Sequence, residues 1–389
     1  MKRGLLLLLI GLLLLPFPAL GAQESPDAAP SPSAAATAAP AFSTLEPAAE
    51  TPQAMTEDEE EARATPLSAA EVAERMRQAG ADADVTGNGT VDEADAIAML
   101  LHVTGRLPDL AALPDMLSDS LLGERYLERF SYTGVQQGEG FYRSASVSYA
   151  LTAVKEKELN YYVADIYLRD LNHFRTAFGL DAYKRTEPVV DMAKNNQAIV
   201  AINGDYYSWK NNKGLVIRNG IVYRESIDRR QDLCVLYSDG VIETYAPDEA
   251  DIEQIISRGA YQSWSFGPSL LDENGQPKTD RSQFRSSIQG PNPRSALGYI
   301  EPGHYLFVTV DGRGRGGSDG ATMRQLSQLM YDHGCTIAYN LDGGGTAVMA
   351  NAEGAISRQS NLSRQCSDIL FIVEDYTVYD DEASGAAED

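Results

Sequence analysis

Basic residues, histidine and cysteine are all scarce in this 389-residue chain, and each scarcity excludes a class of protein. Its 32 Lys and Arg residues face 56 Asp and Glu, and the formal net charge of −24 argues against a general nucleic-acid binder. None of the four histidines lies within the short polar strings that follow the strands, and they match no metal-binding spacing, which disfavours a His-centred mechanism. Three cysteines allow at most one disulfide, so we expect Cys234 and Cys335 to be small buried hydrophobic residues.

The two ends of the chain have compositions that cannot form a folded core. Residues 1–22 begin with two basic residues, continue as a Leu-rich run and end in small residues, which predicts a cleaved secretory signal peptide. An uncleaved membrane anchor is the alternative. Residues 23–66 form an Ala- and Pro-rich acidic linker, and residues 378–389 form an acidic tail. We therefore expect a secreted or cell-surface protein with no membrane segment in the mature chain.

Residues 67–122 contain a string typical of a calcium loop between two helices, DVTGNGTVDEAD. The string resembles one calcium repeat of a dockerin, which implies bound Ca²⁺ and a cohesin partner. Only one repeat is present, so a calcium-stabilised helical spacer is the alternative. The predicted metal ligands are Asp84, Thr86, Asn88, Thr90, Asp92 and Asp95.

From residue 123 to 377 short apolar runs alternate with turn residues, which predicts an α+β domain built on a strand-rich mixed sheet. Helices are expected near 188–195 and 248–257. Asn-Gly at 219–220 and Asp-Gly at 239–240 predict hairpin turns. The expected strands are 161–168, 197–202, 214–217, 234–237, 241–244, 295–300, 305–310, 336–341, 347–350 and 368–373.

At the centre of this domain, residues 304–349 read as strand, Gly-rich loop, helix, strand and Gly-rich loop. Thr322 and Gln325 form a capping box at the start of the helix, and Gly334 is placed to end it. This pattern predicts a βαβ unit, whose two parallel strands tend to be neighbours. Asp311 and Asp342 each follow one of these strands, so we expect them side by side at one sheet edge, where open sheets commonly bind ligands.

Several further motifs occur in one order along the chain: Asn203-Gly204-Asp205, then Pro293-Arg294-Ser295, then Val310-Asp311-Gly312-Arg313, then Asn340-Leu341-Asp342-Gly343-Gly344-Gly345-Thr346, and finally Arg364. This order resembles the phosphodiester glycosidase family. The resemblance implies a hydrolase that cleaves the glycosidic bond of sugar-1-phosphodiesters, such as N-acetylglucosamine-1-phosphodiesters, in glycans or cell-surface polymers. It implies no cofactor for catalysis.

Glycosidases use a pair of carboxyl groups to catalyse cleavage through an oxocarbenium-like transition state. The candidates here are Asp342, Asp311 and Asp205. We expect Asp342 to face the anomeric carbon, Asp311 to be its partner or a ligand of sugar hydroxyls, and Asp205 to hold hydroxyls or to activate water. Arginines provide planar donors for phosphate. The predicted substrate-binding residues are Asn203, Gly204, Arg294, Arg313, Ser318, Asn340, Gly343, Gly344, Gly345, Thr346 and Arg364.

Two functions of other kinds use the same residues. A non-catalytic module would bind a cell-wall polymer or exopolysaccharide without turnover. A metal-dependent phosphodiesterase would use the aspartates as ligands of Mg²⁺ or Ca²⁺. In every case the predicted partner is a glycan or a sugar-phosphate polymer.

Overall fold

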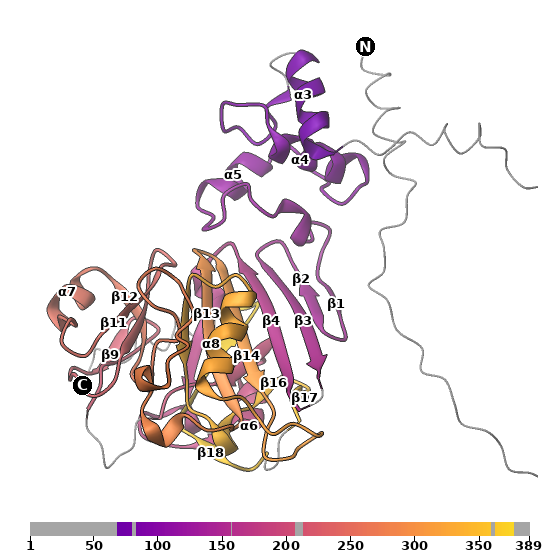
Figure 1. Ribbon diagram of the computed structural model, residues 1–389. Coiled ribbons are helices and arrows are strands. Elements are labelled where there is room, and N and C mark those ends of the chain that lie inside the picture. The colour runs from indigo at the N-terminus through magenta and orange to yellow at the C-terminus, as the bar shows by residue number, and fades with distance from the viewer. Residues whose placement is uncertain (1–67, 80–82, 157, 207–212, 359–361, 377–389) are drawn as a thin grey trace, which may run out of the picture.

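The computed structural model describes residues 68–79, 83–156, 158–206, 213–358 and 362–376 (Figure 1). The predicted signal peptide, linker and acidic tail lie outside these residues. Among the described helices, none has the length and apolar character that crossing a bilayer requires.

A small helical unit comes first in the described chain and lies beside the end of the large sheet (Figure 1). Val72 and Met76 of α3 pack against Ala96 of α4, as the helical pattern of the sequence predicted. Asp92 caps α4 in a reciprocal box with Asp95. The helices of this unit are α3 (Ala69–Ala79), α4 (Glu93–Val103) and α5 (Leu113–Ser118).

The segment between the helical unit and the sheets is held by one buried arginine at the end of strand β4. Arg169 donates to the Ser120 hydroxyl at 3.1 Å, the Gly123 carbonyl at 2.7 Å and the Tyr132 hydroxyl at 3.1 Å. Its guanidinium also lies 4.3 Å from the centroid of the Phe130 ring. The connecting segment that follows the helical unit is therefore held at the end of β4 by specific contacts.

The largest sheet among the described residues has the order β1-β2-β3-β4-β14-β13-β15. Its central strands are long runs that contain aromatic and β-branched residues. All adjacent strands in it are antiparallel. Its members are β1 (Gln136–Gly138), β2 (Phe141–Arg143), β3 (Val147–Lys155), β4 (Asn160–Leu168), β13 (Arg294–Glu301), β14 (His304–Val310) and β15 (Ile337–Asn340).

The predicted strand-helix-strand segment is present, but its two strands are not neighbours. Helix α8 (Met323–Asp332) begins at the predicted Thr322–Gln325 capping box, and Gly334 has φ 81° just after it. Strand β13 lies between β14 and β15 and pairs antiparallel with both. The expectation of adjacent parallel strands is wrong, because the preceding hairpin partner already occupies the place beside β14.

A second sheet packs face to face against the first. It has the order β17-β16-β7-β19-β5. Between the sheets lies an apolar core in which Ile166 and Phe307 meet Ile202 and Leu370. The strands of the second sheet are β5 (Phe174–Phe178), β7 (Val200–Asn203), β16 (Met349–Asn351), β17 (Gly354–Ala355) and β19 (Asp368–Ile372).

Helices cover the outer faces of both sheets, as Figure 1 shows for α8 and the large sheet. Leu326 and Met330 of α8 pack on Val308 and Ala338. Helix α6 (Val189–Asn195) covers the second sheet through Met192. Each helix has one apolar face, which explains why each packs on one sheet.

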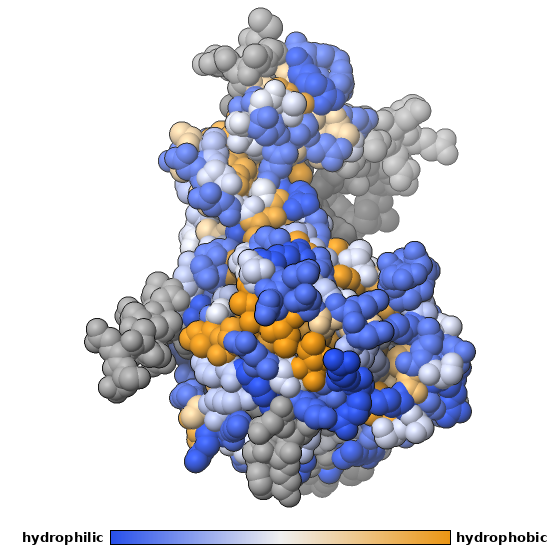
Figure 2. Space-filling model, turned by 90° about the vertical axis from the view of Figure 1, so that its left-hand side faces the viewer, coloured by the Kyte–Doolittle hydropathy of each residue, from blue (hydrophilic) through white to orange (hydrophobic). Residues whose placement is uncertain are grey.

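A three-stranded sheet of β11 (Ile242–Tyr245), β10 (Leu233–Tyr237) and β12 (Ala260–Trp264) carries α7 (Ile252–Ser257). Next to it is a hairpin of β8 (Val216–Arg218) and β9 (Ile221–Arg224). Figure 2 shows the face that bears these elements, where apolar residues form a stretch surrounded by hydrophilic ones. A short ladder of β6 (Glu187–Pro188) and β18 (Gln365–Cys366) completes the strands of the described chain.

Every strand and helix that the sequence predicted in this domain is present, with shifted ends. Both predicted hairpin turns join paired strands, β8 with β9 and β10 with β11. Both cysteines expected in the core are buried and free, as is Cys366. The sequence patterns did not predict the strands β1, β2, β3, β5, β6, β9, β12, β17 and β18.

Candidate active site

The candidate site is one edge of the large sheet, where β14 ends, β13 begins and β15 ends. Arg294 opposes Val310 and Ala296 opposes Asn340 in the strand register, so Asp311 and Asp342 follow at the same edge. Two strand spacings, about 9.5 Å, separate the backbones of β14 and β15. The two aspartates therefore share this edge, with β13 between them.

Asp311 is nearly fully buried, with 1% of its surface exposed. The Tyr162 hydroxyl donates to its Oδ2 at 3.4 Å, while its Oδ1 has no hydrogen-bond partner among the described residues. Burial raises the pKa of this carboxyl to about 6, and the Tyr162 contact and nearby Arg358 oppose the rise. A buried oxygen without a partner is costly, so this carboxyl has an unused capacity to accept a hydrogen bond.

Asp342 lies against the turn that follows β7. The Asn203 side chain donates to the Asp342 carbonyl at 2.7 Å, and the Asp342 N–H donates to the Gly204 carbonyl at 3.2 Å. The Asp342 carboxylate accepts the Gly343 N–H and the Thr346 hydroxyl, each at 2.8 Å. Burial raises the pKa of Asp342 to about 6, and these two donors oppose the rise. The predicted convergence of these motifs is present in the structure.

Two of the three predicted phosphate-binding arginines meet on the glycine loop after Asp342. A Cβ on Gly344, where φ is 68°, would lie 2.8 Å from the Arg313 guanidinium, and one on Gly345 would lie 3.3 Å from the Arg364 side chain. Both arginines are exposed. Arg313 itself has φ 58°, a conformation that non-glycine residues rarely adopt. The edge thus combines two carboxyls with two accessible guanidiniums.

Arg294 is placed differently from the expectation that it binds phosphate. It is buried, and its guanidinium donates to the main-chain carbonyls of Ala321, Ile288 and Gly290 at 2.6–3.0 Å. Burial lowers its pKa to about 10. These contacts favour a role for Arg294 as an anchor of the loops beside the site over a role as a phosphate ligand.

Ser318 and Asn340 also make internal contacts. The Ser318 hydroxyl donates to the Asp311 carbonyl at 2.7 Å and accepts the Asn160 N–H. The Asn340 amide donates to the Gly267 carbonyl at 2.8 Å. Both side chains are fully buried, so they stabilise the loops at the edge and do not face solvent.

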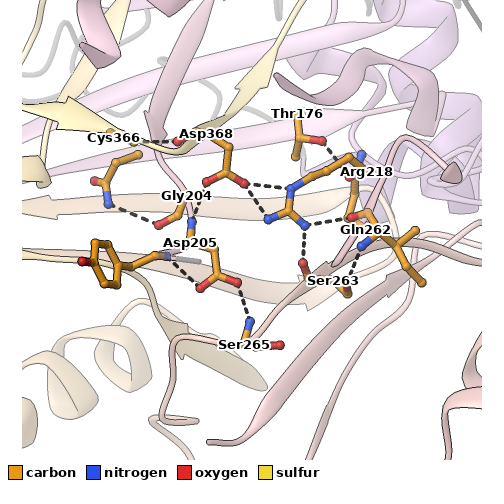
Figure 3. A network of polar contacts seen from close by, with 12 residues as sticks. Thr176, Gly204, Asp205, Arg218, Gln262, Ser263, Ser265, Cys366 and Asp368 are labelled. Carbon is orange, nitrogen blue, oxygen red and sulfur yellow. Dashed lines mark hydrogen bonds and ion pairs between the residues drawn. The ribbon is translucent and has the colours of Figure 1, made fainter. Parts of the chain in front are cut away.

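Asp205 belongs to a closed network behind the edge (Figure 3). Its oxygens accept the N–H groups of Tyr206 at 3.0 Å and Ser265 at 2.7 Å, and burial raises its pKa. Its own N–H donates to Asp368, which in turn pairs with Arg218 at 2.5 Å. This placement favours a structural role for Asp205 over the predicted contact with substrate.

Sequence reasoning missed the other two members of this network. Asp368 and Arg218 expose 0% and 2% of their side chains. Gly204 is required here, because a Cβ on it would lie 2.5 Å from the Asp368 carboxylate. The available signal was a charged residue at the start of the apolar run Asp-Ile-Leu-Phe-Ile, since buried charge needs a partner.

The predicted calcium ligands gather in the loop before α4, but they use their oxygens within that loop. Asp84 accepts the Gly89 N–H at 2.9 Å, Asp95 accepts the Thr86 N–H at 2.9 Å, and Asp92 caps the helix. Among the described residues no group of three or more His, Cys, Asp or Glu side chains is placed to hold a metal ion. The oxygen donors are of the type that Ca²⁺ prefers, and calcium binding at this loop stays a prediction.

Residues 196–373 match the phosphodiester glycosidase family model. This range contains both edge aspartates, both exposed arginines and the buried network. The match supports a glycosidase-type hydrolase function for this part of the chain.

Similar proteins were found among curated sequences and solved structures. An uncharacterized SPbeta prophage-derived protein of Bacillus subtilis (strain 168), YomE, is 33% identical over 193 residues, which are 48% of this chain and 29% of that protein. The chain therefore spans less than a third of that relative's length. The zebrafish N-acetylglucosamine-1-phosphodiester alpha-N-acetylglucosaminidase catalytic domain, auto-inhibited by its pro-peptide, is 20% identical with a TM-score of 0.49, over 59% of this chain and 84% of that one. A hypothetical protein from Synechocystis is 14% identical with a TM-score of 0.45, over 59% and 62%.

Proposed function

We propose that this protein hydrolyses sugar-1-phosphodiesters, breaking the bond between the anomeric carbon and the phosphate oxygen. The observation that carries the proposal is the edge itself, where two carboxyls with pKa values of about 6 lie beside two exposed arginines. The family match over residues 196–373 supports the same chemistry. The substrate is a glycan or a cell-surface polymer, and an extracellular setting is part of the proposal.

Each group has a task that its environment suits. Arg313 and Arg364 hold the phosphate, which carries a negative charge in the substrate and gains more as it leaves. Asp342 faces the anomeric carbon, and Asp311 is the second carboxyl. Because both pKa values are near 6, one carboxyl can be protonated while the other is ionised in mildly acidic solution, which acid–base catalysis at a glycosidic bond requires.

In the reaction, water supplies the oxygen that ends on the anomeric carbon. The phosphate leaves with the electron pair of the broken carbon–oxygen bond, as a phosphomonoester. The proton from water goes to a carboxylate or to the departing phosphate, so the products are a free sugar and a phosphomonoester. Hydrolysis by a phosphodiesterase would instead break a phosphorus–oxygen bond.

The test is hydrolysis of a panel of sugar-1-phosphodiesters by the full chain in ¹⁸O-labelled water. We expect the label in the released sugar and none in the phosphomonoester. Asp342→Asn should reduce kcat/KM by about 10²–10⁴-fold, while Asp332→Asn, an exposed residue on α8, should leave it unchanged. Label in the phosphate would favour the phosphodiesterase, and no release from any diester would favour the non-catalytic binding module.

A further inference from the structure

A large cleft, separate from the aspartate edge, opens between the two main sheets. It has a volume of about 1630 Å³ and is lined by β2, β3, β5, the β8–β9 hairpin and the β16–β17 hairpin. Typical pockets for small ligands are about 300–1,000 Å³. The cleft includes Ile199, just before β7, and Val373, just after β19, whereas Asn203 and Asp368 at the other ends of these strands lie behind the edge. Its size suits a chain of several units.

Aromatic rings line this cleft at several depths. Phe141 and Tyr223 are exposed by 40% and 39%, although large aromatic residues are usually well buried. Tyr149 lies deeper, with 5% of its surface exposed. Flat apolar faces of this kind match the C–H faces of sugar rings, and the carboxamides of Asn172 and Gln197 in the same lining match their hydroxyls.

The lining of the cleft is acidic, whereas the edge balances its two carboxyls with two exposed arginines. Its lining contains five carboxylates, at Glu139, Asp181, Glu353, Glu374 and Asp375. It contains two arginines, of which Arg218 is paired with Asp368 and Arg175 donates to the Tyr261 hydroxyl. An anionic polymer would be repelled here, so the ligand is an uncharged polyhydroxyl compound.

The lining of the cleft contains two tyrosines, Tyr149 and Tyr162, whose hydroxyls bear on what the cleft binds and on how it lies relative to the candidate site. The buried Tyr149 hydroxyl has no hydrogen-bond partner among the described residues, and such groups are rare unless a ligand or water satisfies them. Tyr162 lines the cleft as well, and its hydroxyl lies 3.4 Å from Asp311 Oδ2. Tyr162 therefore lies between the cleft and the candidate catalytic carboxylate.

We propose that this cleft binds an uncharged oligosaccharide stretch of the substrate, while the phosphodiester lies at Arg313 and Arg364. The inference rests on the proposed function for the direction of the chain, but oligosaccharide binding is independent of turnover. In this arrangement the uncharged part of the substrate lies in the acidic aromatic cleft, and its phosphodiester lies at the arginines of the edge.

The experiment measures binding by calorimetry to the full chain carrying Asp342→Asn, which prevents turnover. The probes are uncharged hexasaccharides of N-acetylglucosamine, glucose and mannose, and the anionic probe is hexagalacturonate. We expect at least one uncharged probe to bind, and hexagalacturonate to bind at least tenfold more weakly. Absence of binding by every uncharged probe, or equal binding of hexagalacturonate, would overturn the inference.

Three variants locate the binding. Tyr223→Ala and Phe141→Ala, on opposite sides of the cleft, should each weaken binding at least fivefold, and Tyr149→Phe should weaken it by removing only a hydroxyl. Tyr331→Ala is the matched control, because Tyr331 on α8 is exposed by the same 39% and lies outside the cleft. Unchanged binding in both Tyr223→Ala and Phe141→Ala would contradict the assignment.

Failure of this inference is distinguishable from failure of the proposed function. In the chain with Asp342 intact, hydrolysis of a short sugar-1-phosphodiester, which does not reach the cleft, measures the hydrolase activity alone. Hydrolysis of the short substrate without oligosaccharide binding refutes the cleft alone. Oligosaccharide binding without hydrolysis refutes the hydrolase alone.

Discussion

Asp368 in the buried network and Asp311 at the sheet edge have pKa values raised to the same level, about 6, by the same cause, burial. Their surroundings differ. Asp368 binds Arg218 and the Asp205 N–H, whereas Asp311 keeps one oxygen without a partner among the described residues. A raised pKa therefore does not identify a catalytic group, and the availability of its oxygens separates the two.

The largest expected effect comes from breaking the closed network with Asp368→Asn. The change leaves the Arg218 guanidinium buried without its counter-charge, which typically costs about 3–5 kcal/mol of stability. At about 2–4 °C per kcal/mol the melting temperature should fall by at least about 6 °C. Scanning calorimetry measures this. Glu74→Gln, which breaks the exposed Arg77 pair, should leave the melting temperature unchanged, and an equal loss in both variants would remove the distinction.

Asp311→Asn tests the aspartate at the sheet edge, whose Oδ1 has no partner among the described residues. Activity should fall by about 10²–10⁴-fold, because an amide can neither give nor take the proton. Stability at pH 7.5 should stay the same or rise, because a buried charge is removed. Steady-state kinetics and a melting curve on one preparation measure both. Full turnover, or a loss of stability as large as that of Asp368→Asn, would contradict the contrast.

The pH dependence of stability follows from the raised pKa values. Asp311 and Asp342 titrate near pH 6 in the folded chain and near 4 when unfolded. Between those values the folded chain holds protons that the unfolded chain releases, so these groups stabilise the fold below about pH 4 and lose that contribution as the pH rises through about 6.

We therefore expect a melting temperature several degrees higher at pH 5 than at pH 7.5. Lower net charge at acidic pH contributes to the same trend. The variant Asp342→Asn separates the two contributions, because it removes one titrating group and should flatten the slope. An identical slope in the variant would show that Asp342 does not titrate in this window.

The smallest expected effect concerns Thr346, whose hydroxyl opposes the rise in the Asp342 pKa. Thr346→Val should shift the limb of the pH–rate profile that belongs to Asp342 to higher pH. It should reduce kcat/KM by about 2–10-fold, the value of one hydrogen bond. Thr336→Val, whose hydroxyl contacts main-chain carbonyls far from the edge, is the control and should change neither quantity.

What the sequence predicted well is local. Apolar runs, the Thr322 capping box and the Asn219-Gly220 turn each depend on residues close in sequence, so strands, helices and hairpins were found. The insertion of β13 between β14 and β15 depends on pairing across the whole sheet, which no local pattern encodes.

The predictions for the site differ in the same way between local features and features that depend on distant residues. The motifs at Asn203, Asp342 and Thr346 are in contact, because the ends of β7 and β15 lie close together. The direction of an arginine side chain is a tertiary property, so Arg294 points to main-chain carbonyls instead of outward. Arg218 and Asp368 are 150 positions apart, and their pairing had no local signal.

The contacts of Arg169 also define how mechanical load passes through the molecule. Residues before Leu121 can transmit tension to the sheets through the segment that Arg169 holds, and Arg169 directly follows β4. Strand β4 pairs along seven residues with β14, which ends next to Asp311. The segment that Arg169 holds is thus linked through one antiparallel ladder to the strand that ends at the candidate site.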